Sequence, residues 1–291
     1  MRYILTLIAA RESTALSGAA IDRVRDVVGG GVVDILAPGE AVDIALPALP
    51  DTATVRAALD GAAIDAIVTL AGGRRKGLLV ADMDSTIVTG ETLDELADFA
   101  GLKERIAAIT ARAMNGELDF KAALCERVAM LKGLPVDALE RTWGHVRLTS
   151  GARELVATMR AHGAYAALVS GGFSFFTSRV AALCGFDLHR SNTLLDDGAA
   201  LLGKVAEPIL DRDSKLATLT GLAAERGLQL AATLAVGDGA NDLDMLRAAG
   251  LGVAFHAKPI VAAEARARVD YCGLRALLFA QGYRAEDFAS G

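Results

Sequence analysis

Four short apolar runs in the second part of the chain constrain the fold most, because long helical patterns separate them. The runs are Leu78–Ala81, Tyr165–Val169, Thr233–Val236 and Gly252–Ala254. Continuous apolar runs of this length are typical of strands that are buried on both faces. The amphipathic stretches between them are long enough for crossover helices. The pattern therefore predicts an α/β fold built on a doubly wound parallel sheet.

The first 73 residues carry a different pattern, with strands and helices in the order β-α-β-β-α-β. The predicted strands are Tyr3–Ala9, Val32–Leu36, Val42–Leu46 and Ile64–Thr69, and the predicted helices are Ser17–Val28 and Thr52–Leu59. This order predicts an α+β split βαβ unit, with two helices over one face of an antiparallel sheet. With 291 residues, the chain has room for about two domains. We expect one domain over 1–73, a flexible and solvated linker over 74–77, and a second domain over 78–291.

The segment between the first two apolar runs is much longer than a crossover needs. Its pattern is almost wholly helical from Thr92 to about Thr149. We therefore expect a helical cap over about residues 92–149, at the carboxyl edge of the sheet. Thr92 and Glu95 have the spacing of a capping box at the start of the first cap helix. Further along, Asp197-Gly198 predicts the turn of a hairpin.

The composition argues against several classes of function. Thirty Lys and Arg against 36 Asp and Glu give a formal net charge of −6, so no overall basic field exists to attract a nucleic acid. The longest uncharged stretch, residues 161–178, contains several polar groups, which argues against a membrane span. The three cysteines and four histidines are too scattered for a disulfide framework or a zinc site. The cysteines fit a reducing, cytoplasmic location.

Two carboxylates follow the first apolar run directly. Asp82 and Asp84 are two residues apart, so the period of a strand places both on one side. Ligands of open α/β sheets bind outside the carboxyl ends of the strands. Two acids in such a crevice need a metal ion or a proton to compensate their charge. The alternative is that both acids simply cap the next turn, and the buried strand before them argues against it.

A second acidic segment, Gly237-Asp238-Gly239-Ala240-Asn241-Asp242, follows the third apolar run. Its two glycines permit close approach of the backbone to a ligand. Without a third glycine and a ribose-binding acid, the segment is a poor dinucleotide fingerprint. Acidic groups at two strand ends suit a hard cation with oxygen ligands, which favours Mg²⁺ over zinc.

A third run ends in Ser170-Gly171-Gly172, ahead of a helical stretch. One hydroxyl and several backbone N–H groups near a helix start would form a cradle for an anion. An ordinary turn is the alternative interpretation. Lys215, near the start of a later helix, would add a positive charge, although a lone lysine on a helix is usually solvated.

Together these segments resemble the haloacid-dehalogenase superfamily over roughly Leu78 to Tyr283. The matching motifs are Asp82-Met83-Asp84-Ser85-Thr86, Ser170-Gly171-Gly172, Lys215 and Gly237–Asp242, in the order of that superfamily. Within it, the stretch from Asp82 to Glu91 and the segments Glu126-Arg127-Val128 and Leu131-Lys132-Gly133 are similar to those of the phosphoserine phosphatase family. The N-terminal domain resembles amino-acid-sensing ACT modules, which are regulatory or dimerising.

The resemblance implies metal-assisted phosphoryl transfer through a carboxylate nucleophile. Asp82 would attack phosphorus to form an aspartyl phosphate. Asp84 would protonate the leaving oxygen and later deprotonate water. Mg²⁺ would be held by Asp82, the backbone carbonyl of Asp84, and Asp238.

The same resemblance implies how phosphate is bound. Lys215, Ser170 and the Gly171 amide would hold the phosphate oxygens. Asn241 would orient the phosphate or a metal-bound group. Asp242 would anchor either a water of the metal or Lys215.

The family resemblance also implies the substrate, O-phospho-L-serine, through two residues of the cap. Glu91 suits the ammonium of an amino acid, and the guanidinium of Arg127 suits its carboxylate. From spacing alone, a salt bridge within the cap or a solvent-facing pair would be the alternative. Met114 and Phe120 would wall off the pocket or simply belong to the core.

The expected function is therefore Mg²⁺-dependent hydrolysis of phosphoserine, the last step of serine biosynthesis. Two alternatives remain open on these residues alone. A phosphotransferase would pass the phosphoryl group to an alcohol such as homoserine, and a non-catalytic amino-acid sensor would bind without turnover. We also expect no nucleic-acid or membrane partner, and a homodimer formed through the N-terminal domain.

Overall fold

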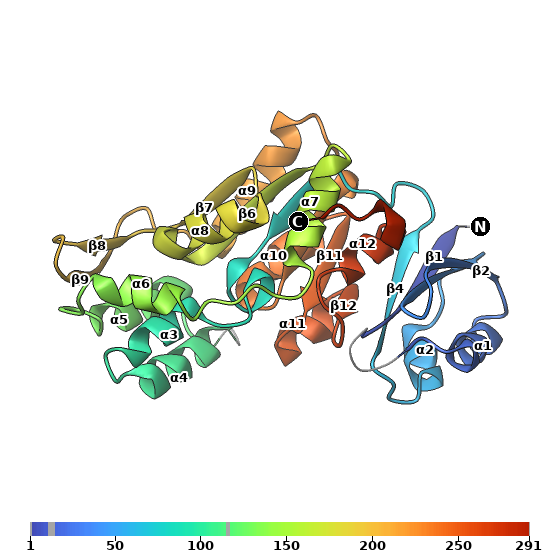
Figure 1. Ribbon diagram of the computed structural model, residues 1–291, viewed down its shortest axis with the longest axis horizontal. Helices are drawn as coiled ribbons and strands as arrows, with labels where there is room; N and C mark the ends of the chain where they lie inside the picture. Colours follow the sequence, from blue (N-terminus) through green and yellow to red (C-terminus); the bar gives the residue numbers. More distant parts are fainter. Residues whose placement is uncertain (1, 11–14, 115–116, 291) are drawn as a thin grey trace.

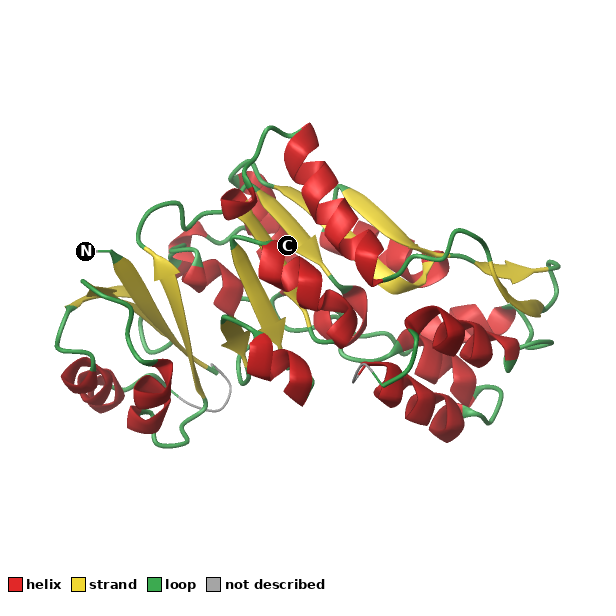
Figure 2. Cartoon of the chain, turned by 180° about the vertical axis from the view of Figure 1, so that it is seen from behind, coloured by secondary structure: helices red, strands yellow, loops and turns green. Residues whose placement is uncertain are grey.

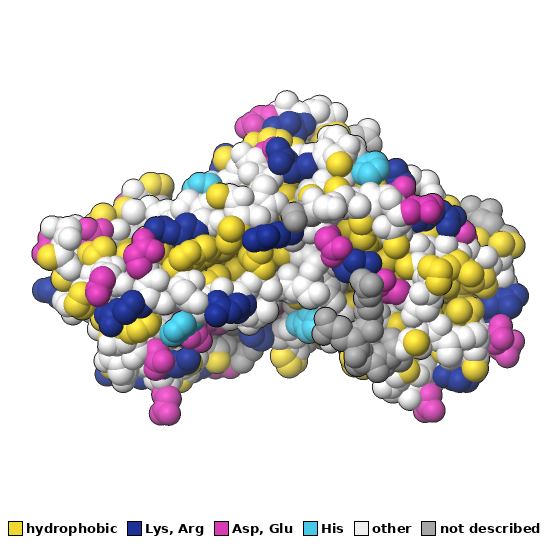
Figure 3. All heavy atoms as spheres, in the orientation of Figure 1, with side chains coloured by type: hydrophobic (Ala, Val, Ile, Leu, Met, Phe, Trp, Pro, Cys, Tyr) yellow, Lys and Arg dark blue, Asp and Glu magenta, His cyan; other side chains and the backbone are white. Residues whose placement is uncertain are grey.

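The computed structural model describes residues 2–10, 15–114 and 117–290. The molecule is elongated, with the N-terminal sheet at one end, a large sheet in the middle and a helical segment at the other end (Figure 1). In the described ranges, no helix combines the length and the apolar character that a bilayer crossing requires. On the face drawn in Figure 3, basic and acidic side chains are interspersed.

The N-terminal sheet has the order and directions of a split βαβ unit. Its spatial order is β2-β3-β1-β4, with every neighbouring pair antiparallel. The strands are β1 (Tyr3–Ala9), β2 (Val32–Ala37), β3 (Ala41–Leu46) and β4 (Ile64–Leu70). Two helices, α1 (Gly18–Val27) and α2 (Thr52–Ala58), cover one face of the sheet (Figure 2). The predicted α+β unit is confirmed, and each element ends within one or two residues of its predicted bounds.

Side-chain caps explain where the two helices begin. The Ser17 hydroxyl accepts a hydrogen bond of 3.2 Å from the backbone N–H of Ala20. The Asp51 carboxylate accepts bonds from the N–H groups of Ala53 and Thr54 at 3.2 and 3.1 Å. Each cap satisfies N–H groups that have no partner within the helix.

The other face of the N-terminal sheet packs on the rest of the chain. Ile8, Leu36 and Ile67 share one buried core with Leu277 and Phe279. The elements that lie against this sheet are α12 (Ala276–Ala280) and β12 (Ala267–Val269). Burial of this apolar face fixes the position of the sheet, because separating it would expose these side chains to water.

Arg74 differs from the expectation of a solvated, flexible linker. Its side chain is 12% exposed and donates to both oxygens of Asp43, at 2.5 and 3.0 Å. It also donates to the Thr6 hydroxyl and to the carbonyls of Phe279 and Ala280. The reason is electrostatic, since the buried Asp43 requires a cationic partner. Arg74 thereby ties the N-terminal sheet to α12.

The central sheet contains six parallel strands, which confirms the predicted α/β class. In spatial order they are β12, β11 (Leu251–Phe255), β10 (Thr233–Gly237), β5 (Leu78–Ala81), β6 (Tyr165–Phe173) and β7 (Leu188–Asn192). The four predicted strands form the middle of the sheet. The two outer strands carry no apolar run that would predict them, because β12 has three residues and β7 is mostly polar.

Helices cover both faces of this sheet, so the doubly wound arrangement is also confirmed. Leu79 and Ala81 of β5 share one core with helices of the first face. Leu78 and Val80 point to the opposite core and the second face. The first set comprises α7 (Ala152–Ala161), α8 (Ser174–Cys184) and α12, and the second comprises α9 (Arg212–Glu225), α10 (Leu243–Ala248) and α11 (Pro259–Glu264).

The insert after β5 is a helical cap, as predicted. Its helices are α3 (Thr92–Asp98), α4 (Lys103–Met114), α5 (Phe120–Ala129) and α6 (Asp137–Trp143). The predicted hairpin is present as β8 (Leu194–Asp196) and β9 (Leu201–Val205), beside α5. The predicted capping box is wrong, because α3 begins at Thr92 itself and the Thr92 N–H donates to the carboxylate of Asp84.

Candidate active site

The carboxyl ends of three adjacent strands bring the predicted acidic and hydroxyl groups together. Asp82 follows β5, Asp238 follows β10, and Ser170 lies in β6, which pairs with β5 on the side opposite β10. The Asp82 N–H donates to the carbonyl of Val236 at 3.0 Å, which continues the pairing of β5 with β10 up to the acid. Parallel pairing therefore gathers these groups at one edge of the sheet.

Lys215 is buried between two carboxylates and is not a solvated side chain. It is 1% exposed, and its Nζ lies 2.8 Å from Asp82 Oδ1 and 2.6 Å from Asp242 Oδ1. Burial alone would lower the pKa of Lys215, but the charges of Asp242 and Asp82 raise it. Burial, with the charge of Asp242, raises the pKa of Asp82 well above its usual range. Lys215 therefore remains a cation at neutral pH.

Gly237 has a different role from the one expected from the sequence. A Cβ at this position would lie 2.3 Å from Cγ of Asp242. A side chain there would displace Asp242, whose Oδ2 also accepts a bond of 3.1 Å from the Gly239 N–H. The glycine therefore provides space for Asp242 as it holds Lys215, rather than for a ligand.

Asp238 carries a carboxylate oxygen that lacks a hydrogen-bond partner. The side chain is fully buried, and its Oδ2 accepts no hydrogen bond. Burial, with the nearby charge of Asp242, raises the pKa of Asp238 to about 7. A buried carboxylate oxygen without a donor is costly, so it is suited to a cation.

The acidic groups at this edge fit a hard divalent ion. Asp82, Asp238 and Asp242 each offer a carboxylate oxygen, and the three oxygens lie within 4.8 Å of one another. An all-oxygen set with the unpartnered Asp238 Oδ2 matches what Mg²⁺ prefers. The cluster contains Asp242, which is not among the predicted ligands. The ligand predicted from Asp84 is its backbone carbonyl and not its side chain.

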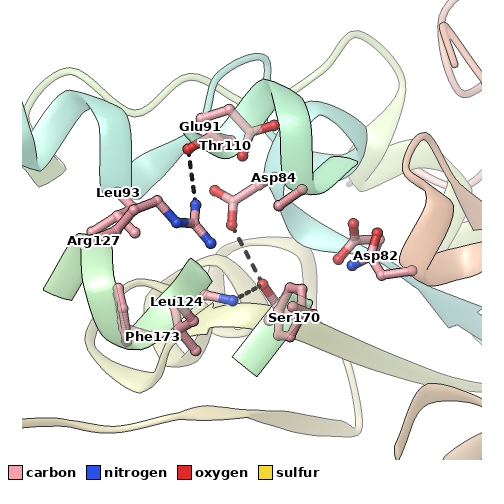
Figure 4. A pocket seen from close by; sticks show the side chains of 14 residues that line it. Asp82, Asp84, Glu91, Leu93, Thr110, Leu124, Arg127, Ser170 and Phe173 are labelled. Atoms are coloured by element: carbon pink, nitrogen blue, oxygen red, sulfur yellow. Dashed lines mark hydrogen bonds between the residues drawn. The ribbon is translucent and has the colours of Figure 1, made fainter. Parts of the chain in front are cut away.

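The Asp84 side chain turns instead toward the cap and the cradle (Figure 4). Its Oδ1 accepts a hydrogen bond of 2.8 Å from the Thr92 N–H, and its Oδ2 accepts one of 3.4 Å from the Ser170 hydroxyl. A Cβ on Gly172 would lie 2.7 Å from this Oδ2, so a side chain there would displace the Asp84 carboxylate. Burial raises the pKa of Asp84. A carboxyl with a raised pKa, next to the cavity, is placed to donate a proton.

The predicted cradle belongs to a strand rather than to a helix start. β6 continues through Phe173, and α8 begins at Ser174. The Ser170 hydroxyl accepts a hydrogen bond of 2.8 Å from the Gly172 N–H. Ser170 and Gly171 therefore lie in the irregular end of β6, which holds Ser170 near Asp84, and α8 starts two residues after Gly172.

Glu91 and Arg127 lie on the cap side of the same cavity. The Glu91 carboxylate accepts a hydrogen bond of 2.7 Å from the Ser85 hydroxyl. Burial, together with the charges of Asp84 and Asp238, raises the pKa of Glu91 to about 8. Arg127 is buried and donates to the Thr110 hydroxyl at 2.8 Å and to the Ala123 carbonyl at 3.1 Å. Among the ion pairs of the described residues, none joins Glu91 to Arg127.

One small cavity of about 40 Å³ connects these groups. It is lined by Asp82, Asp84, Glu91, Arg127, Ser170, Gly171 and Asn241, among other residues. The Asn241 Oδ1 is buried and lacks a hydrogen-bond partner. Phe120 closes the cavity from the cap, since a Cβ on Gly171 would lie 2.6 Å from its ring. The side chain of Met114, the other expected wall, lies outside the described part of the structure.

Two further residues, which were not predicted from the sequence, hold the cap groups in place. The Thr110 hydroxyl accepts a hydrogen bond from Arg127 and donates one of 2.7 Å to the Asp94 carboxylate. Ser85 has a left-handed backbone, with φ of 53°, and holds Glu91. Ser85 follows Asp84 directly in the acidic motif, which was a usable signal, whereas a threonine within a helix gave none.

Comparison with known proteins assigns the family. Residues 79–247 match the model of the haloacid dehalogenase-like hydrolases. The chain is 48% identical over 190 residues to a phosphoserine phosphatase of Streptococcus thermophilus, covering 65% of this chain and 88% of that protein. It is 41% identical over 256 residues to one of Streptomyces coelicolor, covering 86% of this chain and 62% of the relative.

A solved structure supports the same assignment. The structure described as a phospho-aspartyl intermediate analogue of phosphoserine phosphatase superimposes with a TM-score of 0.67 at 38% identity. The match covers 70% of this chain and 98% of that one. The chain therefore belongs to the haloacid dehalogenase-like hydrolases and, within them, to the phosphoserine phosphatase family.

Proposed function

We propose that this chain is a phosphatase that hydrolyses O-phospho-L-serine to serine and phosphate with the aid of Mg²⁺. The observation that carries the proposal is the composition of the cavity wall. The acid Asp82 opens on the same space as Glu91 and Arg127, which are not paired with each other. A phosphate ester that is also a zwitterion matches these charges.

Asp82 is the proposed nucleophile. Its carboxylate oxygen forms a bond to phosphorus while the bond from phosphorus to the serine oxygen breaks, which leaves an aspartyl phosphate. Asp84 gives a proton to the departing oxygen, so serine leaves as a neutral alcohol. Asp84 then takes a proton from water as the water oxygen attacks phosphorus, and Asp82 is released as a carboxylate.

Mg²⁺ would be held by the carboxylates of Asp82 and Asp238 and by the backbone carbonyl of Asp84. When bound, the ion offsets the repulsion between an anionic nucleophile and a phosphate dianion. Asp242 would act through Lys215, which it contacts at 2.6 Å. The paired Lys215 stays positive and close to Asp82, where the transferring phosphoryl group would lie.

The remaining phosphate contacts come from the cradle. Ser170, the Gly171 amide and Asn241 would bind the non-bridging oxygens, together with Lys215. The unpartnered Oδ1 of Asn241 supports a role in orienting a group that carries a proton or a metal. On the cap side, ionised Glu91 would bind the substrate ammonium, and Arg127 would bind the carboxylate.

The proposal extends to the organisation of the whole chain. An ACT-like domain over 1–73, regulatory or dimerising, would precede the segment 74–77 and the phosphatase domain over 78–291. The cytoplasm is the proposed location, supported by three cysteines that form no disulfide. The product, serine, places the reaction at the last step of serine biosynthesis.

The test is a panel of phosphomonoesters assayed with Mg²⁺ and with a chelator, on the parent and on Asp82→Asn. Asparagine keeps the shape but cannot act as the nucleophile. We expect selective, metal-dependent release of phosphate from phosphoserine, lost in Asp82→Asn. Residual activity of the variant would overturn the mechanism, and selectivity for sugar phosphates would overturn the substrate. Phosphate release that falls when homoserine is added would indicate a phosphotransferase.

A further inference from the structure

Lys258 lies against the acidic cluster, and the reaction described above does not use it. It stands in the loop after β11, the strand that pairs with β10. Its backbone N–H donates to the carbonyl of Asp238 at 3.0 Å, and its Nζ lies 3.6 Å from Asp238 Oδ2. Both the backbone and the side chain of Lys258 therefore contact Asp238.

The two lysines at the acidic cluster pair with different carboxylates, and Asp238 pairs with Lys258. Lys215 is engaged by Asp82 and Asp242. Within the described ranges, Lys258 is the cation that forms an ion pair with Asp238. The Nζ faces the oxygen that accepts no hydrogen bond, which is also an oxygen suited to the divalent ion.

The loop that carries Lys258 is fastened by His256. This residue has a left-handed backbone, with φ of 44°, and its N–H donates to the Val269 carbonyl at 2.8 Å. Its ring Nε2 lies 2.9 Å from the Cys272 carbonyl oxygen, to which it donates. A strained backbone of this kind persists only where surrounding contacts hold it.

The segment that holds His256 is in turn fastened to the N-terminal sheet. Asp65 of β4 is 2% exposed, and its carboxylate accepts from three successive backbone N–H groups. These belong to Asp270, Tyr271 and Cys272, at 2.7, 3.2 and 2.9 Å. Since the N-terminal sheet and the cap lie at opposite ends of the molecule (Figure 1), this route reaches the site without involving the cap.

We propose that Lys258 is an internal counter-ion that competes with the divalent cation for Asp238, and that Asp65 and His256 hold it in position. The N-terminal sheet is thereby coupled to the metal site. The inference rests on the proposed metal site. When Mg²⁺ binds, Lys258 gives up its contact with Asp238 and turns to solvent, which its 36% exposed side chain permits. Lys258 therefore stabilises the metal-free protein and weakens metal binding.

The first test is calorimetric titration of the metal-free full chain with Mg²⁺ alone, on the parent and on Lys258→Met. In the parent, Mg²⁺ must break the Lys258–Asp238 pair, whose charged atoms lie 3.6 Å apart. Lys258→Met has no such pair, so we expect its affinity for Mg²⁺ to be higher by about fivefold or more, the strength of a unit-charge pair at this distance even in a water-like dielectric. The same variant melts at a lower temperature than the parent in chelator. Lys258→Arg retains the parent affinity within about twofold, and Lys204→Met, at an exposed lysine of the distant hairpin, changes neither quantity.

The second test concerns the route to the N-terminal sheet. His256→Asn tolerates the left-handed backbone but loses the bond to Cys272. We expect His256→Asn and Asp65→Asn each to raise Mg²⁺ affinity by less than Lys258→Met does. Neither should change it further in the Lys258→Met background, as for residues that act through one group. If Asp65→Asn fails to fold, the His256→Asn cycle decides alone.

The outcomes separate the two proposals. A parent that binds no Mg²⁺ overturns the proposed metal site. A parent that binds Mg²⁺ with an unchanged or lower affinity in Lys258→Met overturns the counter-ion role alone. Additive effects of His256→Asn and Lys258→Met overturn the positioning route and leave the counter-ion role in place.

Discussion

The Asp84 carboxylate accepts a hydrogen bond of 2.8 Å from the backbone N–H of Thr92, the first residue of the cap. One oxygen of the proposed acid thus satisfies an N–H group at the start of α3, and the other faces Ser170. The bond from Thr92 opposes the effect of burial on the pKa of Asp84. Displacement of α3 would therefore change both the position and the proton affinity of this acid.

Asp84→Asn should separate the two halves of the reaction. With phosphoserine, kcat falls by about 10²- to 10⁴-fold, because the leaving alkoxide receives no proton. An aryl phosphate with an acidic phenol needs no such proton, so Asp82 still becomes phosphorylated. We therefore expect a stoichiometric burst of phenol followed by slow turnover, measured by stopped-flow absorbance. A variant that is equally slow in both phases, with no burst, would contradict this role for Asp84.

Glu91→Gln should alter stability in a pH-dependent way. In the metal-free protein the pKa of Glu91 is raised from 4.5 to about 8, mainly by burial. Between these values the folded state holds a proton that the unfolded state releases, so rising pH favours unfolding. Ionisation of this buried carboxyl therefore lowers the stability of the folded state. The loss is absent below about pH 4.5, grows as the pH rises and is complete above pH 8. Glutamine removes it.

The measurement for Glu91→Gln is thermal unfolding in chelator at pH 5 and at pH 8.5. We expect a Tm above that of the parent by at least about 3 °C at pH 8.5, since each kcal/mol shifts Tm by roughly 2–4 °C at this size. The difference shrinks toward zero at pH 5. Glu126→Gln, an exposed position on the same cap, should leave the pH dependence unchanged. A variant less stable than the parent at pH 8.5 would refute the prediction.

Arg127→Ala should weaken selection for the amino-acid part of the substrate. A charged hydrogen bond contributes about 1.5–3 kcal/mol, so kcat/KM for phosphoserine falls by about 10- to 100-fold. For an aryl phosphate, which has no carboxylate, kcat/KM stays within about threefold. The ratio between the two substrates is the deciding quantity, and an unchanged ratio would contradict the assignment.

Thr110→Val serves as the matched variant for Arg127. It keeps the shape of the side chain but removes the hydroxyl that accepts from Arg127 at 2.8 Å. We expect a smaller loss of kcat/KM for phosphoserine in the same direction, because the guanidinium remains but is less firmly oriented. No loss would show that the bond to Thr110 does not position Arg127.

The sequence predicted those parts of the fold that depend on local patterns and on general sheet geometry. Strand β5 was predicted with its observed bounds, since a continuous apolar run ends at a polar pair. The meeting of Asp82 with Asp238 followed from parallel strands whose carboxyl ends share an edge. The position of Lys215 was tied to the site through the family resemblance, because its helix alone gave no sign of burial.

Contacts between distant segments could not be predicted in this way. Nothing near Thr110 in the sequence indicates that it meets Arg127. Thr92 and Glu95 have the right spacing for a capping box. In the structure, however, the Asp84 carboxylate, which follows β5, accepts the hydrogen bond from the Thr92 N–H at the start of α3. Arg74 stands among glycines and cations, which favours a solvated linker until the buried Asp43 is brought beside it. Local rules fail here because tertiary packing supplies stronger partners.

Arg74→Ala should release the N-terminal sheet from its support. The substitution leaves the buried Asp43 without its cation, and breaking a buried pair costs about 3–5 kcal/mol. Because Arg74 is 12% exposed, we expect the lower end, about 3 kcal/mol in the free energy of unfolding. Denaturant unfolding followed by circular dichroism measures this change. A separate early transition would indicate that the sheet detaches before the rest of the chain unfolds.

The neighbouring Arg75 provides the control for this prediction. It is half exposed, pairs with Asp287 at 3.0 Å and lies over the ring of Tyr283. An exposed pair of this kind contributes at most about 1 kcal/mol, so Arg75→Ala should unfold close to the parent. The contrast tests burial and not charge, because both variants remove one arginine from the same short segment. Equal losses in Arg74→Ala and Arg75→Ala would show that the contact with Asp43 is not what holds the sheet.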